Sequence, residues 1–286
     1  MRVTAYFPRA DHNSAASALA EGLERKGVTL LRGEDITADA IGDCDFAVAF
    51  GMRDHTVAIA RRHGKPSLIM DLGFLRRANN RNHDGYYQLG WDRLCWLPED
   101  PQPKDRLAKL QLTIHPDHEP WEERSRRWLI AAQVPEDMQH GMDEDQLGHL
   151  YRRYYEAIRE LQPDAHITLR LHPQAPMLPA PCQGLAWDAV DLRNSLLGAL
   201  TKAGQVVTYN STTFYEAYLE GVPVFCSPSA HYREAAAGGT DLLTCAPVRR
   251  RVEEKVAYLS RVAYAQWTMD EAASGLPWDF LKYHMP

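Results

Sequence analysis

QVVTYNSTTFYEAYLEGVPVFCSPSAHY, residues Gln205–Tyr232, is the stretch that decides the fold. Its pattern predicts a strand, a hydroxyl-rich turn, a short helix that stops at Gly221, and a second strand. Such a turn suits an anion, because the start of a helix offers unpaired N–H groups and the positive end of the helix dipole. Asn210, Ser211, Thr212 and Thr213 add side-chain donors. We therefore expect the turn to bind the phosphate of a nucleotide or nucleotide-sugar.

The same turn also has a purely structural interpretation. Thr213 and Glu216 have the T-x-x-E spacing of a helix capping box, and Gly221 and Pro223 are typical of a helix stop followed by a new strand. Capping explains these residues, but it does not require the polar residues that precede Thr213. We expect Thr213 to cap the helix and Ser211 and Thr212 to bind the ligand, while Glu216 is either the cap partner or a ribose ligand.

The remaining sequence alternates predicted strands and helices. In the first part, strands are expected at Val3–Phe7, Val28–Leu31, Phe46–Phe50 and Ser67–Met70, and helices at Ser14–Lys26 and His55–His63. In the second part, strands are expected at Arg126–Gln133, His166–Leu171 and Asp241–Cys245, and helices at Glu144–Leu161, Asp188–Ala203 and Val248–Trp267. Alternation of this kind predicts α/β domains, each with a parallel sheet and helices on both faces.

A stretch rich in proline and acid, Leu97–Trp121, separates the two series. We expect a Rossmann-like domain at residues 1–120, a second at 121–265, and a tail at 266–286 that packs back across the structure. Ligands in open α/β sheets bind outside the carboxyl ends of strands. The predicted site is therefore a cleft between the two domains.

Composition excludes several classes of protein. The chain has 286 residues, a net charge of −6 and five scattered cysteines without a C-x-x-C pair. These features do not favour a broadly basic nucleic-acid coat, a zinc ribbon or a disulfide framework. The start of the sequence lacks the apolar core of a signal peptide, and no run approaches the roughly 18 apolar residues of a membrane span. We expect a cytoplasmic, reduced protein.

No cofactor motif is present. The P-loop, G-x-G-x-x-G and G-x-S-x-G patterns are absent. Asp100, His115, Asp117, His118 and Glu119 form a cluster of histidines and acids, but their spacing matches no metal signature. We expect no metal and no cofactor other than the donor substrate itself.

Two strand ends carry candidate polar groups. His172-Pro173 ends one predicted strand, and Arg170 lies on the same side of that strand. Beside a phosphate, a histidine can donate a hydrogen bond. Asp71 ends the strand SLIMD and precedes Leu72-Gly73, so its carboxylate is placed to act as a general base. A surface histidine at a proline-fixed turn and a turn-capping aspartate are the structural alternatives.

The segment after Asp71 interleaves basic and aromatic residues. The basic residues are Arg76, Arg77, Arg81 and Arg93, and the aromatic ones are Tyr86, Tyr87 and Trp91. This mixture suits a phosphate backbone with base stacking, a sugar acceptor, or a solvated loop without function.

Together these segments resemble the motifs of GT-B glycosyltransferases that use CMP-activated acidic sugars, such as bacterial sialyltransferases and capsular Kdo transferases. The matching residues are Asp71–Arg76 (DLGFLR), His172-Pro173 and Ser211-Thr212. Leu129–Gln139 and Asn210–Val224 are similar to capsule-polysaccharide transferases. The resemblance implies a GT-B-like fold, two Rossmann-like domains facing across a cleft.

The resemblance also implies roles for single residues. Asp71 would deprotonate the acceptor, and His172 would contact the donor phosphate. Ser211 and Thr212 would bind phosphate or the donor sugar, and Glu216 would reach the ribose. The family has two acids before the glycine, whereas the second position here is Leu72.

The acceptor is a separate question. The chain is short for a capsule enzyme, and residues 263–278 (AYAQWTMDEAASGLPW) resemble transferases that bacteriophages use to decorate modified DNA bases. That resemblance implies a hydroxymethylated pyrimidine in DNA as acceptor. The basic and aromatic residues after Asp71 would hold the flipped base. A surface-polysaccharide transferase, a nucleotide-sugar epimerase and a catalytically dead binding protein remain the alternatives.

Overall fold

A computed structural model of the chain describes residues 3–8, 14–33, 37–51, 55–78, 84–119, 123–137, 139–192, 194–241, 243–244 and 246–286. The chain divides into two compact units. Unit 1 comprises Met1–Leu110 with Leu259–Pro286, and unit 2 comprises Gln111–Tyr258. The structure thus moves the first boundary from residue 120 to Leu110 and assigns the tail to unit 1.

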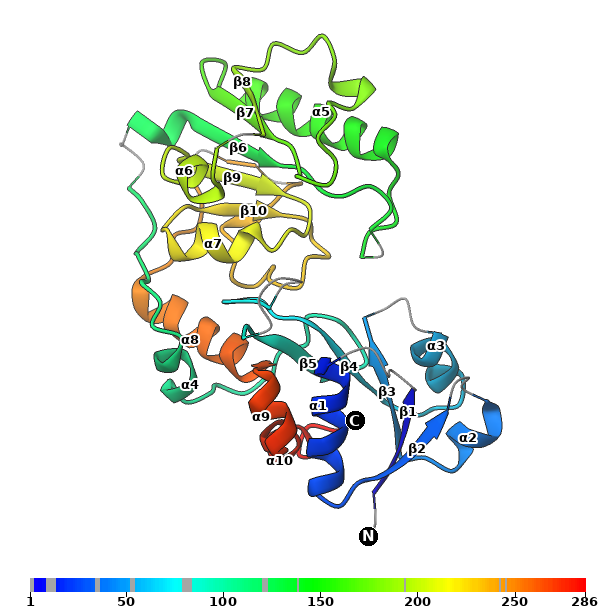
Figure 1. The fold of residues 1–286 in the computed structure, drawn as a ribbon. Coiled ribbons are helices and arrows are strands. Elements are labelled where there is room, and N and C mark those ends of the chain that lie inside the picture. Colours follow the sequence, from blue (N-terminus) through cyan, green and yellow to red (C-terminus); the bar gives the residue numbers. More distant parts are fainter. Residues whose placement is uncertain are drawn as a thin grey trace. The chain divides into compact units, whose positions relative to one another are not determined.

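Unit 1 is built on a six-stranded sheet with the order β12-β5-β4-β3-β1-β2 (Figure 1). Its strands are β1 (Thr4–Pro8), β2 (Thr29–Gly33), β3 (Phe46–Phe50), β4 (Ser67–Leu72), β5 (Tyr87–Trp91) and β12 (Gln266–Trp267). The strands β1 to β4 are parallel, whereas β5 runs antiparallel to both β4 and β12. The segment after Asp71, which the sequence suggested was a loop, therefore ends in a buried strand.

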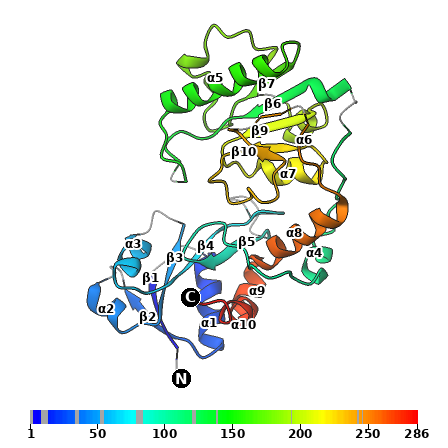
Figure 2. The ribbon, with the colours of Figure 1, turned by 180° about the vertical axis from the view of Figure 1, so that it is seen from behind.

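Helices of unit 1 include α1 (Ser14–Arg25), α2 (Ala38–Gly42), α3 (His55–Arg62), α4 (Asp105–Lys109), α9 (Met269–Ser274) and α10 (Leu276–Leu281). Figure 2 shows α1 beside α9 and α10 on one side of the sheet. At Gly22 a Cβ would lie 1.8 Å from the carbonyl oxygen of Ala272, so only glycine permits this approach. The ring of Trp278 stacks on Phe46 at 5.2 Å and meets Trp91 edge-on. The C-terminal segment is thus part of the core of unit 1.

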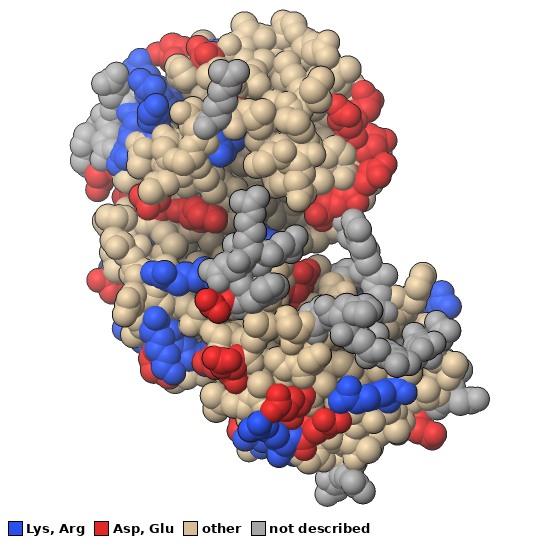
Figure 3. All heavy atoms as spheres, in the orientation of Figure 1, with Lys and Arg blue, Asp and Glu red and all other residues tan. Residues whose placement is uncertain are grey.

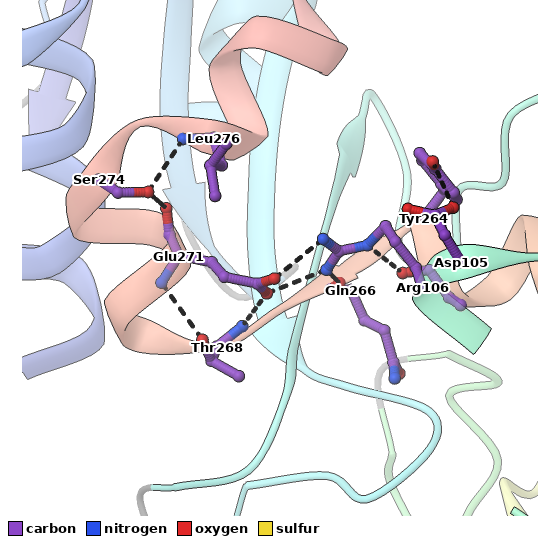
Figure 4. Close-up of polar contacts among 9 residues, drawn as sticks. Asp105, Arg106, Tyr264, Gln266, Thr268, Glu271, Ser274 and Leu276 are labelled. Atoms are coloured by element: carbon purple, nitrogen blue, oxygen red, sulfur yellow. Dashed lines mark hydrogen bonds and ion pairs between the residues drawn. The ribbon is translucent and has the colours of Figure 1, made fainter. Parts of the chain in front are cut away.

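Arg106 in α4 fixes this segment from the other side (Figure 4). Its guanidinium donates to both carboxylate oxygens of Glu271 at 2.9 Å. It also donates to the carbonyls of Ala263 and Gln266, at 3.0 and 2.9 Å. The guanidinium lies 3.8 Å from the ring centre of Trp267, close enough for a cation–π contact. Because Arg106 is 8% exposed, these contacts compensate for a charge that is largely removed from water.

Unit 2 contains a fully parallel sheet with the order β11-β10-β9-β6-β7-β8. The strands are β6 (Arg127–Ala131), β7 (His166–Arg170), β8 (Ala189–Asp191), β9 (Gln205–Thr208), β10 (Val224–Cys226) and β11 (Gly238–Gly239). Numbered from β6 as the first, this is the order 3-2-1-4-5-6 of doubly wound dinucleotide-binding folds. The sequence prediction of parallel α/β domains is confirmed.

The helices of unit 2 include α5 (Glu144–Leu161), α6 (Leu196–Leu200) and α7 (Thr213–Leu219), with 3-10 turns at η1 (Glu123–Arg126) and η2 (Ala180–Cys182). Helix α8 (Val252–Tyr264) begins in unit 2 and ends in unit 1. A capping box at Asp143 and Gln146 starts α5. The buried side of α5, including Tyr151 and Ile158, packs on Trp128 and Ile130 of β6. This places the main core of unit 2 on one face of the sheet.

Three sequence predictions are wrong in detail. Asp188–Ala203 forms strand β8 and helix α6 instead of one helix, because Ala189–Asp191 pairs with β7 and Ser195 caps a new helix. The last strand lies at Gly238–Gly239, before the predicted Asp241–Cys245. The helix predicted to reach Trp267 ends at Tyr264, since Gln266 and Trp267 pair with β5.

Among the described residues, none of the helices combines the length and the apolar character needed to cross a bilayer.

Candidate functional site

The best candidate site of unit 2 lies where its strand order reverses. β6 and β9 are neighbours in the sheet, but the chain leaves them toward opposite edges, β7 and β10. Doubly wound sheets bind ligands outside the carboxyl ends of the two strands at such a point. Here Gln133 follows β6, and Asn210, Ser211 and Thr212 follow β9. The turn identified from the sequence therefore lies at the switch point of the sheet.

A buried polar network lies directly beneath this turn. The Oγ1 of Thr208, a fully buried side chain, accepts hydrogen bonds from Nε2 of Gln133 at 3.0 Å and from the backbone N–H of Ser211 at 3.4 Å. The backbone N–H of Gln133 donates to the Tyr151 hydroxyl at 2.6 Å. Burial raises the pKa of Tyr151, so the phenol stays neutral. The network links the ends of β6 and β9 through uncharged groups.

The opposite side of the turn is held by aromatic residues. The Tyr232 hydroxyl donates to the carbonyl oxygen of Ser211 at 2.9 Å, and the Tyr232 ring stacks on Phe214 at 4.0 Å. Next to it, Nε2 of His231 lies 3.2 Å from the Tyr215 hydroxyl. Burial lowers the pKa of His231 to about 3, so this histidine is neutral at ordinary pH. Both backbone polar groups of Ser211 are therefore fixed by buried partners.

The structure changes the capping interpretation of this turn. Helix α7 begins at Thr213, and Thr212 in the N-cap position makes no side-chain cap bond. The Oγ of Ser211 accepts from the Thr213 N–H at 3.2 Å and lies 3.1 Å from Thr213 Oγ1. Thr213 is thus inside the helix, and the prediction that it is the capping residue is wrong. Ser211 takes over that contact, while Glu216 lies on the exposed side of α7.

The other predicted donor-side residues surround neighbouring strand ends. His172 follows β7, and its Nδ1 accepts from the Gln174 N–H at 3.2 Å, so Nε2 carries the proton when the ring is neutral. Pro173 is exposed. Arg170 forms an ion pair with Asp191 of β8 and donates to the Asn194 carbonyl at 3.0 Å.

Asn210 connects the loop after β9 to the loop after β6. Its Nδ2 donates to Oε1 of Gln139, in the loop between β6 and α5, at 3.4 Å. The loops after β6 and β9 therefore meet at their outer ends as well as through Thr208.

In unit 1, Asp71 lies near the carboxyl end of β4. Its Oδ1 accepts from the Leu72 N–H at 2.7 Å, and the side chain is half-buried. A Cβ placed on Gly51 would lie 3.9 Å from Asp71 Oδ2, so the carboxylate sits beside the end of β3. Leu72, which stands where the resembled family has an acid, packs against the core of unit 1.

Strand β5 supports the backbone at this position. Gln88 pairs with Asp71 across β4 and β5, donates to the Leu72 carbonyl at 2.9 Å and accepts from the Cys95 N–H at 2.6 Å. Burial, with the charge of Asp71 nearby, raises the pKa of Cys95 to about 12, so this thiol is not a nucleophile at neutral pH. Asp71 thus remains the candidate for proton transfer in unit 1.

The predicted acceptor-binding residues are separated by the structure. Trp91 is 2% exposed, and its indole N–H donates to the Leu281 carbonyl at 3.0 Å. Tyr87 is buried as well. Both belong to the core of unit 1, so the prediction that they contact an acceptor is wrong. The sequence could not separate them, because an aromatic residue suits a buried strand as well as a binding loop.

The remaining residues of that set differ in position. Arg76 and Arg77 are exposed, and Arg76 Nε donates to the Leu110 carbonyl at 2.6 Å. Tyr86 is half-buried and bridges to Arg77. Arg81 lies outside the described residues.

The cluster of histidines and acids has structural roles. Asp117 forms a buried ion pair with Lys255, whose ammonium also donates to the Tyr218 carbonyl at 2.7 Å. Glu119 forms an ion pair with Arg249 at 3.0 Å. Within the described ranges, no group of three or more His, Cys, Asp or Glu residues is arranged to hold a metal ion.

Solved structures of other proteins share this architecture. The sequence matches no family model and no curated protein. Among solved structures, a chain described as Thermosulfurimonas dismutans KpsC, beta Kdo 2,4 transferase, aligns over 93% of this chain and 92% of its own length, with a TM-score of 0.59 and 17% identity. A second, described as the beta Kdo 2,7 transferase of the same KpsC, aligns over 97% and 99%, with a TM-score of 0.56 and 13% identity. The fold is GT-B-like. At these identities the likeness extends to the fold alone.

Sequence reasoning missed four residues that hold the site. Gln133, Thr208 and Tyr232 lie inside stretches quoted from the sequence but were not singled out, and Tyr151 lies in the predicted helix Glu144–Leu161. One signal was available: Thr208 ends the apolar run QVVT and Gln133 ends LIAAQ, and a polar residue that closes a buried strand requires a partner. The identity of those partners depends on strands that are far apart in sequence.

Proposed function

We propose that this chain is a glycosyltransferase that moves a sugar from a nucleotide-sugar to a hydroxyl acceptor. The observation that carries the proposal is the turn after β9, which presents Asn210, Ser211 and Thr212 at the switch point of a parallel sheet. The GT-B-like fold supports the same reaction class, since two similar solved chains, with TM-scores of 0.59 and 0.56, are described as Kdo transferases.

In the proposed reaction, unit 2 holds the donor. Ser211 and Thr212 hydroxyls and the Nε2–H of His172 donate to the donor phosphate, and Glu216 binds the ribose. The network under Ser211 fixes the backbone of this loop before the donor arrives. Fixed donors cost little reorganisation when charge develops on the leaving phosphate.

Asp71 of unit 1 supplies the base. The acceptor oxygen forms a bond to the anomeric carbon, and the bond between that carbon and the phosphate oxygen breaks. The nucleotide leaves with that oxygen, and the acceptor proton passes to Asp71. General-base assistance of this kind contributes about 10²–10⁴-fold to a rate.

For the acceptor, a saccharide hydroxyl is better supported than a base in DNA. The DNA proposal relied on aromatic stacking after Asp71, and two of its three aromatic residues, Tyr87 and Trp91, are in the core. On the face drawn in Figure 3, described basic and acidic side chains are interspersed and do not form one broad basic surface. Arg76, Arg77 and Tyr86 are the residues that either acceptor would contact.

A donor screen tests the proposal. Thermal shifts with CMP, UDP and GDP identify the nucleotide, because a ligand that binds only the folded state stabilises it by RT ln(1 + [L]/Kd). The matching nucleotide-sugars are then incubated with saccharide acceptors and, separately, with DNA containing hydroxymethylcytosine or hydroxymethyluracil. Mass spectrometry measures the added sugar on each product.

Each outcome has a definite meaning. Sugar on the saccharide supports the proposal as stated, and sugar on the DNA nucleoside selects the other acceptor. Conversion of the nucleotide-sugar without any acceptor would identify an epimerase. Failure of every nucleotide to shift the melting temperature, with no product formed, would overturn the proposal.

A further inference from the structure

A cavity in unit 2 has its basic end beside the first residues of β6 and β7. It has a volume of about 230 Å³, and its lining includes Arg127, His166, Thr168, Asp191 and Lys202. Arg127 and His166 are the first residues of β6 and β7. Four residue steps along a strand put them roughly 13 Å from the carboxyl ends. The cavity extends along β7 and β8 to Asp191, the partner of Arg170, but its basic end is distant from the turn after β9.

The sheet register explains why polar side chains gather here. Arg127 pairs with His166 across β6 and β7, and Thr168 pairs with Ala189 across β7 and β8. Paired residues of neighbouring strands point to the same face, so these side chains form adjacent rows. Trp128 and Ile130, which alternate with them, belong to the core under α5. The cavity is thus on the face opposite α5, beside α6.

The charges in this cavity are not balanced. Among the described residues that line it, Asp191 is the only acid, and it is already paired with Arg170. The side chains of Arg127 and Lys202 make no hydrogen bond or ion pair with any described residue. Two permanent cations therefore border a hollow without a matching anion. Figure 3 shows Lys and Arg gathered on the side of this unit that carries α6.

The described arginines differ in their partners, and some, such as Arg61 and Arg62, have no acidic partner among the described residues. Many have an acidic partner: Arg25 with Glu21, Arg32 with Glu24, Arg106 with Glu271, Arg126 with Asp164, Arg159 with Asp188, and Arg249 with Glu119. The pair at Arg126 is the most informative, because Arg126 precedes Arg127 directly. An acidic partner is thus present next to this cavity, but it pairs with Arg126 and leaves Arg127 without one among the described residues.

We propose that this cavity is a second binding site for a small phosphorylated molecule, of the size of a sugar phosphate. Arg127 and Lys202 bind the phosphate group, and the hydroxyl of Thr168 and the imidazole of His166 contact the attached polar groups. The volume is below the roughly 300 Å³ at which pockets for drug-sized ligands begin, which favours a small anion. A hollow between strands and a helix also fits a compact ligand better than a duplex backbone. The site does not depend on the proposed transferase activity.

Calorimetry on the whole chain tests this site. The probes are inorganic phosphate and glucose 1-phosphate at millimolar concentration, with a short DNA duplex as the second source of phosphate. We expect the sugar phosphate to bind, and Arg127→Ala and Lys202→Ala each to weaken it by about tenfold, the loss of one hydrogen bond to a charged group. Both side chains are exposed, so the variants should fold.

Two control variants distinguish this site from alternatives. Arg62→Ala removes an exposed charge from α3 in unit 1 and should leave binding unchanged. Ser211→Ala alters the candidate donor site, and binding that survives it belongs elsewhere. The proposal is overturned if no phosphate compound binds, if Ser211→Ala abolishes binding while Arg127→Ala does not, or if only the duplex binds.

Discussion

The two units place different chemistry at the carboxyl ends of their parallel strands. In unit 2 the turn after β9 is held by uncharged groups, with Thr208 and Gln133 on one side and Tyr232 on the other. In unit 1 the end of β4 carries a carboxylate, Asp71, whose backbone is supported by the antiparallel strand β5. A fixed neutral turn suits the binding of an anion, whereas a half-buried carboxylate suits proton transfer. The residues that follow the parallel strands, and not the sheets themselves, therefore make the two strand ends chemically different.

The largest expected effect comes from removing the carboxylate of unit 1. Asp71→Asn keeps the side-chain shape and its acceptor for the Leu72 N–H, but it cannot take up a proton. We expect kcat to fall by about 10²–10⁴-fold with little change in donor KM. Steady-state kinetics with the donor found in the nucleotide screen measure both constants. The control is Asp43→Asn, an exposed acid of the same unit. If Asp71→Asn and wild type had equal kcat values, Asp71 would not be the general base.

The next effect concerns the ion pair between Arg106 and Glu271, which holds the C-terminal segment in unit 1. Arg106→Met leaves Glu271 as an uncompensated, largely buried carboxylate, which we expect to cost about 3–5 kcal/mol of unfolding free energy. Chemical denaturation measures this cost. The double variant Arg106→Met with Glu271→Gln should recover part of it, because no unpaired charge remains. Arg251→Ala, which breaks an exposed pair with Glu254, should change little. If Arg106→Met lowered the unfolding free energy as little as Arg251→Ala does, the C-terminal segment would be held by its apolar contacts alone.

A smaller effect tests the network of unit 2. Thr208→Val has nearly the same shape but leaves the Gln133 amide and the Ser211 N–H without their acceptor. We expect a loss of about 1–3 kcal/mol in unfolding free energy and a raised donor KM. Thr208→Ser restores the hydroxyl and should restore KM. A donor KM that is the same in Thr208→Val and wild type would show that the turn does not need this support.

The smallest effect is a pH dependence next to the same turn. His231 has its pKa lowered to about 3 by burial, so the unfolded chain binds a proton below about pH 6.5 that the folded chain excludes. His231 therefore contributes a loss of stability as the pH falls from about 6.5 toward 3. Because the ring is partly exposed, we expect a penalty of roughly 1 kcal/mol at pH 5 relative to pH 7.

His231→Gln removes the titrating group while keeping a polar side chain beside Tyr215. Unfolding measured at both pH values should show a smaller difference between them for this variant than for wild type. An identical pH dependence would mean that His231 is charged or solvated in the fold.

The sequence by itself determined the fold class, because burial on both faces of a parallel strand leaves apolar runs such as Phe46–Phe50, and the amphipathic period of Glu144–Leu161 identifies a helix. It also located the turn at Asn210–Thr212, since strand, turn and helix are local features. Tertiary structure alone decided that Tyr87 and Trp91 are core residues, that Thr208 and Gln133 are partners, and that Arg127 lies beside His166. Each of these depends on strand order and register between distant segments, and local propensity contains no information about which strands become neighbours.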